Sequence, residues 1–146
     1  MKLVIGCDHA GLELKTELLA HLKAAGHAVD DVGTHDHASI DYPDYAAKVA
    51  LAVADRLVPL GVLICGSGQG MCMAANKVKG VRAAVCSDTF SAHAVREHND
   101  ANVLCLGQRV VGPGLALEIV DTFLDAEFEG GRHARRVGKI MDLEGR

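Results

Sequence analysis

The sequence predicts an α/β fold built on a five-stranded parallel sheet with helices on both faces. Short β-branched apolar runs alternate five times with longer amphipathic stretches, which is the order that parallel strands joined by helical crossovers require. The chain has 146 residues, of which 49% are hydrophobic and 23% charged, the usual length and composition of one compact domain. We therefore expect residues 1–146 to form a single domain.

The expected elements follow one another without an internal repeat or a linker. Strands are expected at residues 3–5, 28–32, 62–65, 82–86 and 103–106, and helices at 12–25, 45–57, 71–78, 90–97 and 115–124. Short apolar runs of this kind are typical of strands buried on both faces of a sheet. The alternation therefore indicates a doubly wound, Rossmann-like sheet.

Two of the expected helices carry an apolar stripe at helical spacing. In the first helix the stripe consists of leucines and is followed by a glycine stop, at Leu12, Leu18, Leu19, Leu22 and Gly26. In the second helix Val49, Val53 and Leu57 form the stripe, and Pro43 suits the first helical turn. We expect both stripes to face the core.

The end of the chain reads EGGRHARRVGKIMDLEGR from Glu129 onward. A glycine break is followed by a basic and then an amphipathic piece, which predicts a final helix reaching away from the sheet. Such a helix is suited to contact a partner subunit.

Charge and composition exclude several classes of partner. The chain has 15 Lys and Arg against 19 Asp and Glu, a formal charge of -4 and a pI near 6.0, which argues against a general nucleic-acid or anionic-membrane binder. Aromatic residues make up only 3%, with no Trp, so base-stacking platforms are poorly supported. Any anion that binds is expected to be small and held locally.

Five cysteines are present, an odd number with neither CxxC nor paired metal-ligand spacing. We expect reduced thiols in a cytoplasmic protein, because the first residues also lack a secretory apolar core. Cys7, Cys86 and Cys105 lie in apolar strand segments and are expected in the core, whereas the role of Cys72 stays open.

Ligands of doubly wound sheets bind beyond the carboxyl ends of the strands, and the first such loop contains Asp8 and His9. A carboxylate and an imidazole at this place are suited to bind a polar substrate. The alternative is that Asp8 simply caps the N-terminus of a helix and that His9 is an ordinary polar loop residue. This alternative explains the loop equally well.

The loop after the third expected strand has alternate glycines at Gly66, Gly68 and Gly70, with Ser67 and Gln69 between them. Alternate glycines let several backbone N–H groups converge on one oxygen, so the loop is a candidate oxyanion cradle. Sharp turns also select glycine, and the spacing matches neither the dinucleotide-binding nor the P-loop pattern.

Cys65 ends the third expected strand, directly before this loop. Most strand cysteines are inert, but the positive end of a helix and nearby amides favour the thiolate. We therefore interpret Cys65 as a candidate functional thiol.

The other candidate polar residues come late in the chain. His98 and Asn99 precede the fifth strand and Arg109 follows it. On a helix, Arg132 and Arg136 would share one face and could grip a phosphate through planar, multiply hydrogen-bonded guanidinium groups. A solvated basic face is the alternative for this cluster.

Six motifs occur together in the order CDHAG, DYPDYA, ICGSGQGM, AANKVKGVRA, HNDANVLCLGQRVVG and EGGRHARRV. With them the chain closely resembles the type B ribose-5-phosphate isomerases, a family that includes related allose- and galactose-6-phosphate isomerases. The resemblance covers essentially the whole chain. It implies an enzyme of the pentose phosphate pathway that interconverts ribose 5-phosphate and ribulose 5-phosphate without metal or cofactor, as a homodimer or a dimer of dimers.

The resemblance also implies roles for individual residues. By motif position Cys65 resembles the base that abstracts a proton, and His98 the acid that opens the furanose ring. The substrate contacts it implies are Asp8, His9, Tyr42, Gly66, Ser67, Gly68, Gln69, Gly70, Asn99, Arg109, Arg132 and Arg136. Met71 stands where the members that lack the cysteine carry a glutamate, so the chain resembles the cysteine-using branch.

The order of strands leads to one geometric expectation. If the third and fifth strands are parallel, His98 precedes its strand while Cys65 ends its own, so they lie at opposite edges of one sheet. A five-residue strand spans roughly 17 Å, too far for both side chains to touch one sugar. We therefore expect a composite site that takes His98 and Asn99 from a neighbouring subunit.

Three other functions compete with this interpretation. A hexose-6-phosphate isomerase differs only in its substrate. A nucleotide-binding module is suggested by the glycine loop and by Asp88 beyond the fourth strand, but the glycine spacing is wrong for it. A thiol phosphatase or redox protein lacks the expected Arg after Cys65 and a CxxC pair.

Overall fold

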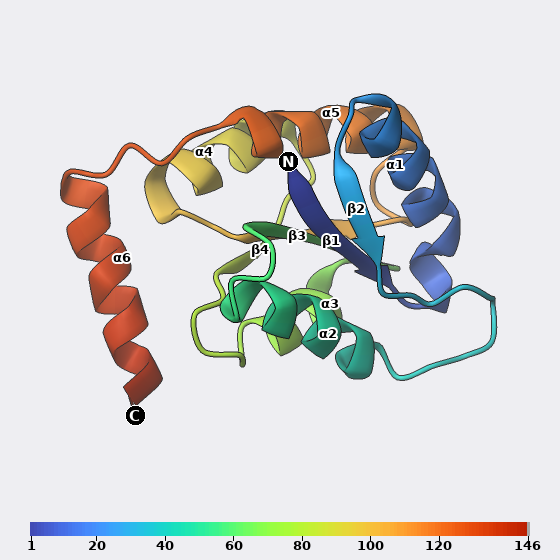
Figure 1. The fold of residues 1–146 in the computed structure, drawn as a ribbon, viewed down its shortest axis with the longest axis horizontal. Coiled ribbons are helices and arrows are strands. Elements are labelled where there is room, and N and C mark those ends of the chain that lie inside the picture. Colours follow the sequence, from blue (N-terminus) through green and yellow to red (C-terminus); the bar gives the residue numbers. More distant parts are fainter. Residues whose placement is uncertain (146) are drawn as a thin grey trace.

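The computed structural model describes residues 1–145 (Figure 1), and these form one five-stranded sheet and six α-helices. All strand pairs are parallel, in the order β2-β1-β3-β5-β4. The strands are β1 Lys2–Cys7, β2 Ala28–Asp31, β3 Leu60–Cys65, β4 Ala83–Val85 and β5 Val103–Gly107. The predicted five-stranded parallel sheet is confirmed.

The helices cover both faces of the sheet, as predicted. Their bounds are α1 Leu12–Ala24, α2 Tyr42–Ala54, α3 Gln69–Ala75, α4 Thr89–Asn99, α5 Pro113–Asp125 and α6 Arg132–Asp142. In Figure 1, α1, α4 and α5 lie on one face of the sheet and α2 and α3 on the other. None of the helices in residues 1–145 has the length and apolar character needed to cross a membrane.

Each face of the sheet has its own apolar core. Leu18 and Leu22 of α1 pack with Ile119 and Phe123 of α5 on one face, and Val49 of α2 packs in the other core. Strand β3 is buried along its whole length between the two cores. Packing on both faces explains why β1, β3 and β5 are apolar runs without alternation.

The second predicted helix is displaced relative to the structure. Helix α2 begins at Tyr42, with Pro43 in its first turn, and ends at Ala54. Arg56 has a φ of 57° and its N–H donates to Val53 O at 3.0 Å, which turns the chain out of the helix. Leu57 is therefore 66% exposed and the expectation that it faces the core was wrong.

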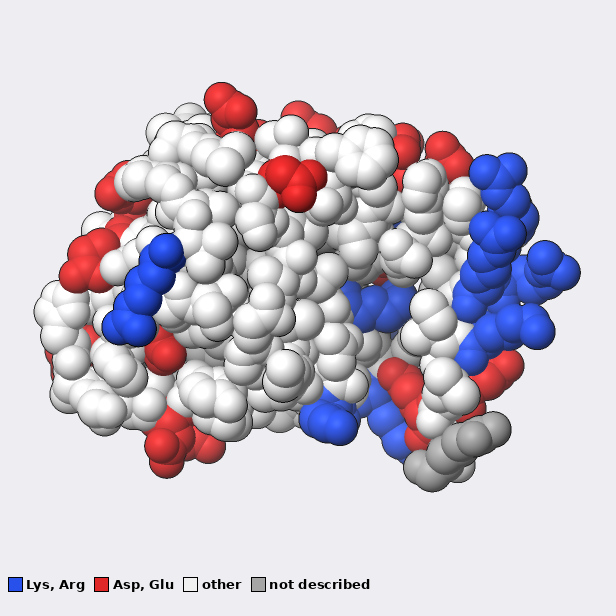
Figure 2. Space-filling model, turned by 180° about the vertical axis from the view of Figure 1, so that it is seen from behind, with Lys and Arg blue, Asp and Glu red and all other residues white. Residues whose placement is uncertain are grey.

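Helix α6 leaves the body of the domain after Gly131 and stands apart from the sheet in Figure 1. Only His133 and Val137 of this helix are buried, and basic side chains gather along it (Figure 2). The predicted final helix is confirmed, and its contact with a partner subunit stays a prediction.

Candidate active site

The carboxyl ends of β1, β3 and β5 lie side by side and bring three of the predicted loops together. Cys7 of β1 pairs with Ile64 of β3, and Cys65 pairs with Gly107 of β5. The loops that follow these strands therefore meet at the carboxyl ends of the strands, where parallel sheets bind their ligands.

Cys65 is the last residue of β3 and is 6% exposed. The backbone N–H of Gly68 donates to its sulfur at 3.0 Å. The helix that follows, α3, has only seven residues, and the Gly68 amide at its start is the backbone group that contacts the sulfur.

The glycine loop has the close backbone approach that its sequence predicts. Gly68 has a φ of 80°, a conformation that favours glycine. A Cβ atom at Gly70 would lie 2.7 Å from the ring of Tyr42, and one at Gly66 would lie 3.4 Å from the guanidinium of Arg109. Tyr42 and Arg109 therefore flank the loop that follows Cys65.

The first loop joins the same edge. Asp8 donates its backbone N–H to Ile64 O at 3.2 Å, and its carboxylate accepts from the N–H of Ala10 at 2.9 Å. The interpretation of Asp8 as a helix cap is thus confirmed for the short 3₁₀ turn His9–Gly11. Nδ1 of His9 accepts from the N–H of Ile40 at 3.3 Å, which leaves the other ring nitrogen for a further partner.

His98 and Asn99 lie near the amino ends of the strands, whereas Cys65 lies at their carboxyl ends. They end α4, before β5 begins at Val103, and Val103 pairs with Gly61 at the start of β3. The expected parallel register and the separation of Cys65 from His98 within one chain are confirmed.

Helix α6 contacts α4 near His98. The rings of His98 and His133 are stacked, with centroids 4.4 Å apart and planes inclined by 14°, and His133 Nε2 lies 3.3 Å from the carboxylate of Glu129. Exposed Arg132 and Arg136 belong to the same helix. The structure therefore divides the predicted residues into two groups. One group lies with Cys65 at the carboxyl ends of the strands, and the other lies with His98 near their amino ends.

His98, Glu129 and His133 place possible metal-ligand atoms within 4.8 Å of one another. Stacked parallel rings direct their in-plane nitrogen lone pairs side by side, whereas a metal ion needs lone pairs that converge on one point. The arrangement therefore does not fit an ion.

The remaining thiols divide as the sequence predicts. Cys7, Cys86 and Cys105 are buried, and burial raises the pKa of Cys7 and of Cys86 to about 11. Cys72 is half-buried, and its hydrogen bond with the Cys105 thiol lowers its pKa to about 7 against the effect of burial.

Lys15 is a residue that the sequence analysis missed. It is 1% exposed, and its ammonium donates to Asp31 Oδ1 at 2.8 Å and to Thr34 O at 2.6 Å. The signal was present in the sequence, because Lys15 stands three and seven residues before two leucines of the apolar stripe. A lysine in that register lies on the buried face.

Comparison with known proteins decides the family. Residues 3–140 match the ribose/galactose isomerase family. The chain is 53% identical over 145 residues to ribose-5-phosphate isomerase B of Escherichia coli, covering 99% of this chain and 97% of that one. The chain belongs to the ribose/galactose isomerase family. The resemblance drawn from the six motifs is confirmed.

Solved structures of this family have the same fold. Ribose-5-phosphate isomerase B of Clostridium thermocellum matches with a TM-score of 0.98 and 56% identity, covering 99% of this chain and 98% of that one. The enzyme of Mycoplasma genitalium, solved with bound ribulose-5-phosphate, matches with a TM-score of 0.95 and 48% identity, covering 99% and 97% of the two chains.

Proposed function

We propose that this member of the ribose/galactose isomerase family interconverts ribose 5-phosphate and ribulose 5-phosphate through an enediolate. The observation that carries the proposal is the 3.0 Å contact between the Gly68 N–H and the sulfur of Cys65. It supports a thiol base beside the backbone N–H groups of the glycine loop, at the carboxyl ends of the strands, where parallel sheets bind their ligands. Both are what an aldose–ketose isomerisation needs.

The reaction of the open-chain aldose begins at its C2–H bond. The Cys65 thiolate takes this proton and becomes a thiol, while the electron pair of the bond forms the C1=C2 double bond and the carbonyl oxygen at C1 becomes an oxyanion. N–H groups of the loop from Gly66 to Gly70 stabilise that oxyanion. The thiol then returns its proton to C1 and becomes a thiolate again, while the proton of the C2 hydroxyl is transferred to the oxyanion at C1, so that the C2 carbonyl and the C1 hydroxyl of the ketose form.

The ring must open before this step, and the phosphate must be held. We assign ring opening to His98, because an imidazole can exchange a proton with the ring oxygen near neutral pH. Arg132 and Arg136 would bind the phosphate, and Asn99 would contact the sugar. Binding of the unreactive phosphate orients the reacting carbons over the base.

At the Cys65 edge, four residues would complete the substrate contacts: Asp8, His9, Tyr42 and Arg109. Because His98 and Asn99 lie at the other edge of the sheet, each site would combine Cys65 of one subunit with His98 and Asn99 of another in a homodimer or a dimer of dimers. The proposed reaction uses only side chains and backbone groups of the protein.

The test is isomerisation of added ribose 5-phosphate in the presence of EDTA. Cys65→Ala removes the base, so we expect kcat to fall by about 100- to 10,000-fold with the circular dichroism spectrum unchanged. Cys72→Ala is the matched control, since it removes a half-buried thiol of the next helix, and it should retain activity. Full activity of Cys65→Ala would remove the thiol from the mechanism.

A hexose 6-phosphate is the second candidate substrate, because the matching family includes galactose isomerases. Side-by-side rates on ribose 5-phosphate and allose 6-phosphate separate the two. The nucleotide-binding alternative relied on Asp88 as an acidic residue that binds the ligand. The structure gives Asp88 another role, because its carboxylate caps α4 by accepting from the N–H of Ser91 at 2.7 Å and from the Ser91 hydroxyl at 2.9 Å.

A further inference from the structure

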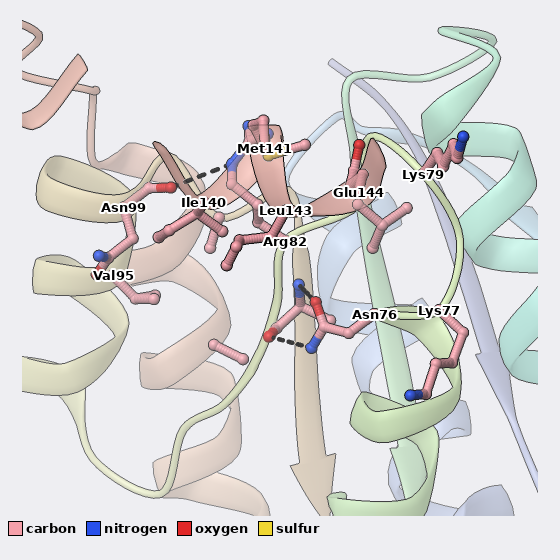
Figure 3. Close-up of a pocket in the computed structure, with 14 residues that line it drawn as sticks. Asn76, Lys77, Lys79, Arg82, Val95, Asn99, Ile140, Met141, Leu143 and Glu144 are labelled. Carbon is pink, nitrogen blue, oxygen red and sulfur yellow. Dashed lines mark hydrogen bonds between the residues drawn. The ribbon is translucent and has the colours of Figure 1, made fainter. Parts of the chain in front are cut away.

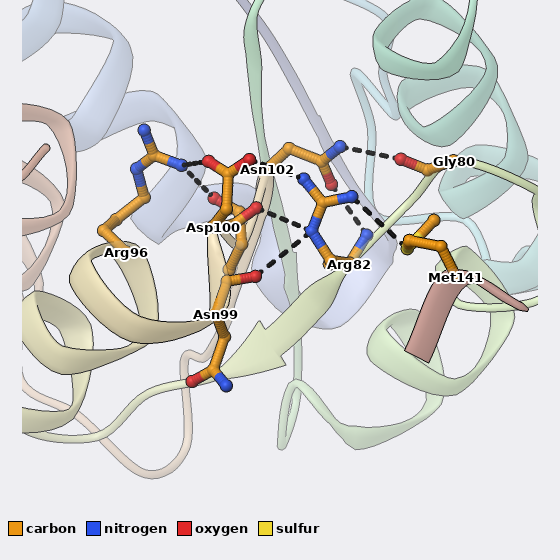
Figure 4. A network of polar contacts seen from close by, with 8 residues as sticks. Gly80, Arg82, Arg96, Asn99, Asp100, Asn102 and Met141 are labelled. Carbon is orange, nitrogen blue, oxygen red and sulfur yellow. Dashed lines mark hydrogen bonds and ion pairs between the residues drawn. The ribbon is translucent and has the colours of Figure 1, made fainter. Parts of the chain in front are cut away.

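The C-terminal end of α4, which carries His98 and Asn99, is closed by an aspartate (Figure 4). Asp100 has a φ of 47° and a ψ of 43°, its N–H donates to Arg96 O at 3.2 Å, and the next N–H, of Ala101, donates to Val95 O at 3.1 Å. This pair of bonds is the cap in which glycine or asparagine normally takes the left-handed position.

An aspartate is disfavoured at this position by its charge. Its short side chain tolerates the left-handed conformation as asparagine does, but a negative charge at the C-terminus of a helix is repelled by the helix dipole. This cost falls on the residue that directly follows His98 and Asn99. Departures from local preference are expected at functional positions.

Two arginines compensate the charge of Asp100. Arg96 Nη1 lies 2.9 Å from Oδ1, and Arg82 Nη2 lies 3.0 Å from Oδ2. The arginine side chains are 14% and 18% exposed, respectively, so solvent screens these pairs less than it screens surface pairs.

The same guanidiniums bind carbonyls at the end of the helix and in the two residues that follow it. Arg82 Nε donates to Asn99 O at 3.1 Å and to Asp100 O at 2.8 Å, and Arg96 Nη1 donates to Ala101 O at 2.7 Å. The carbonyls at a helix end have no partner within the helix. Here they are held by side chains that the Asp100 carboxylate orients.

The backbone of Arg82 is hydrogen-bonded next to the edge strand β4. The backbone N–H of Arg82 donates to Asn102 Oδ1 at 2.7 Å, and Asn102 Nδ2 donates to Gly80 O at 2.9 Å. The next residue, Ala83, begins β4. The end of α4 is thus fixed to the strand by polar contacts.

Apolar packing does not support Asn99 on all sides. A groove of about 700 Å³ runs beside it, lined by Asn99, Arg82, residues that follow α3 and residues of α6 (Figure 3). The polar network is therefore what holds this side of the helix end in place.

We propose that Asp100, together with Arg82 and Arg96, is a positioning residue that holds His98 and Asn99 in the geometry for opening the sugar ring. This inference rests on the proposed function, since it presumes that His98 acts on the substrate. Asp100 acts through the backbone of its neighbours and does not itself contact the sugar.

The test compares two reactions of the same variants. Isomerisation of ribose 5-phosphate requires ring opening, whereas exchange of a C1 hydrogen of open-chain ribulose 5-phosphate with D₂O requires Cys65 and the amide nest. In Asp100→Asn, asparagine keeps the size and suits the left-handed conformation but loses the charge that orients the arginines. We expect kcat for isomerisation to fall by about 10- to 100-fold while the exchange rate changes less than about threefold.

Three further variants complete the design. His98→Asn gives the reference loss of ring opening. Asp121→Asn breaks an ion pair with His21 between α5 and α1, at 2.7 Å, and should keep both rates. Arg82→Lys keeps the charge but loses the planar fork, so it should show the same selective loss and serves if Asp100→Asn does not fold.

The outcomes distinguish this inference from the proposed function. Absence of isomerisation by the wild type would overturn the proposed function, whereas full activity of His98→Asn would overturn the ring-opening role of His98 and, with it, the positioning role of Asp100. An impaired His98→Asn beside a fully active Asp100→Asn, or an equal loss of isomerisation and exchange in the network variants, would overturn the positioning role alone.

Discussion

At Cys65, the sulfur and the N–H of Gly68 meet at 3.0 Å because the loop turns at a residue with a φ of 80°. A Cβ atom at Gly68 would lie 3.1 Å from the carbonyl carbon of Leu106. The backbone conformation of one glycine therefore positions the N–H that contacts the sulfur of Cys65.

Gly68→Ala is expected to withdraw this donor. The added methyl group is strained at positive φ and meets backbone atoms, so the loop has to shift. We expect kcat for ribose 5-phosphate to fall by about 10- to 100-fold, somewhat less than the loss of a whole oxyanion donor. Gly112→Ala is the control, because a Cβ atom there meets nothing within 4 Å. Unchanged kcat in Gly68→Ala would exclude the amide from catalysis.

The thiols are expected to differ in their reaction with iodoacetamide. The thiolate is the reactive form, and the pKa of Cys72 is about 7 while those of Cys7 and Cys86 are about 11. Alkylation of Cys72 should therefore rise as the pH increases through about 7, with Cys7 and Cys86 unmodified. Mass spectrometry of peptides from pH 5 to 9 measures this. Half-maximal labelling of Cys72 near its ordinary value of 9.0 would contradict it.

The depressed pKa of Cys72 also has a consequence for stability. Because the folded state favours the thiolate, this group contributes stability above the unfolded pKa, and the contribution is lost as the pH falls through about 7. The wild type should gain more stability than Cys72→Ala between pH 7 and pH 9.

Among the elements, α1 and β2 are joined by a buried ion pair that also holds the following loop. Lys15 and Asp31 lie 2.8 Å apart with side-chain exposures of 2% and 22%, and Lys15 also binds Thr34 O. The loop that starts there leads to Ile40, whose N–H binds His9, and then to Tyr42. The pair thus stabilises the frame of the site as well as the fold.

Lys15→Met should be far more destabilising than the loss of an exposed ion pair that also involves an aspartate of β2. Removing one partner of a buried pair costs about 3–5 kcal/mol of unfolding free energy. Lys2 pairs with Asp30 at 3.4 Å, with exposures of 55% and 59%, so Lys2→Met should cost roughly 0–1 kcal/mol. Urea unfolding of both variants measures the difference. Equal losses would show that burial does not strengthen the Lys15 pair.

For the whole molecule, the two groups of site residues lie at opposite edges of the sheet. Cys65 ends β3, whereas His98 lies beyond the start of β5, its neighbour in the sheet. Two copies related by a twofold axis would form two equivalent sites, each using both edges. The proposed composite site follows from this arrangement.

Co-expression of Cys65→Ala with His98→Asn tests the composite site. In a mixed dimer, one site would receive both defects and the other neither, so random pairing should restore about a quarter of the wild-type activity for a symmetric dimer. Purified separately, each variant should be inactive. If the co-expressed preparation stays inactive as well, each site is built within one chain.

The sequence alone determined the alternation of strands and helices, the parallel sheet and the loops that carry Cys65, Asp8 and the glycines. These are local properties, because hydrophobic period and turn residues act over a few neighbours along the chain. The family was also readable, since six spaced motifs occur in one order.

Only the tertiary structure decided the strand order, the exposure of Leu57, the burial of Lys15 and the pairing of Asp100 with two arginines. These features depend on contacts between segments far apart in the sequence, which local patterns do not specify. Arg82 and Asp100, for example, are 18 residues apart, and they meet because β4 pairs with β5 at the edge of the sheet.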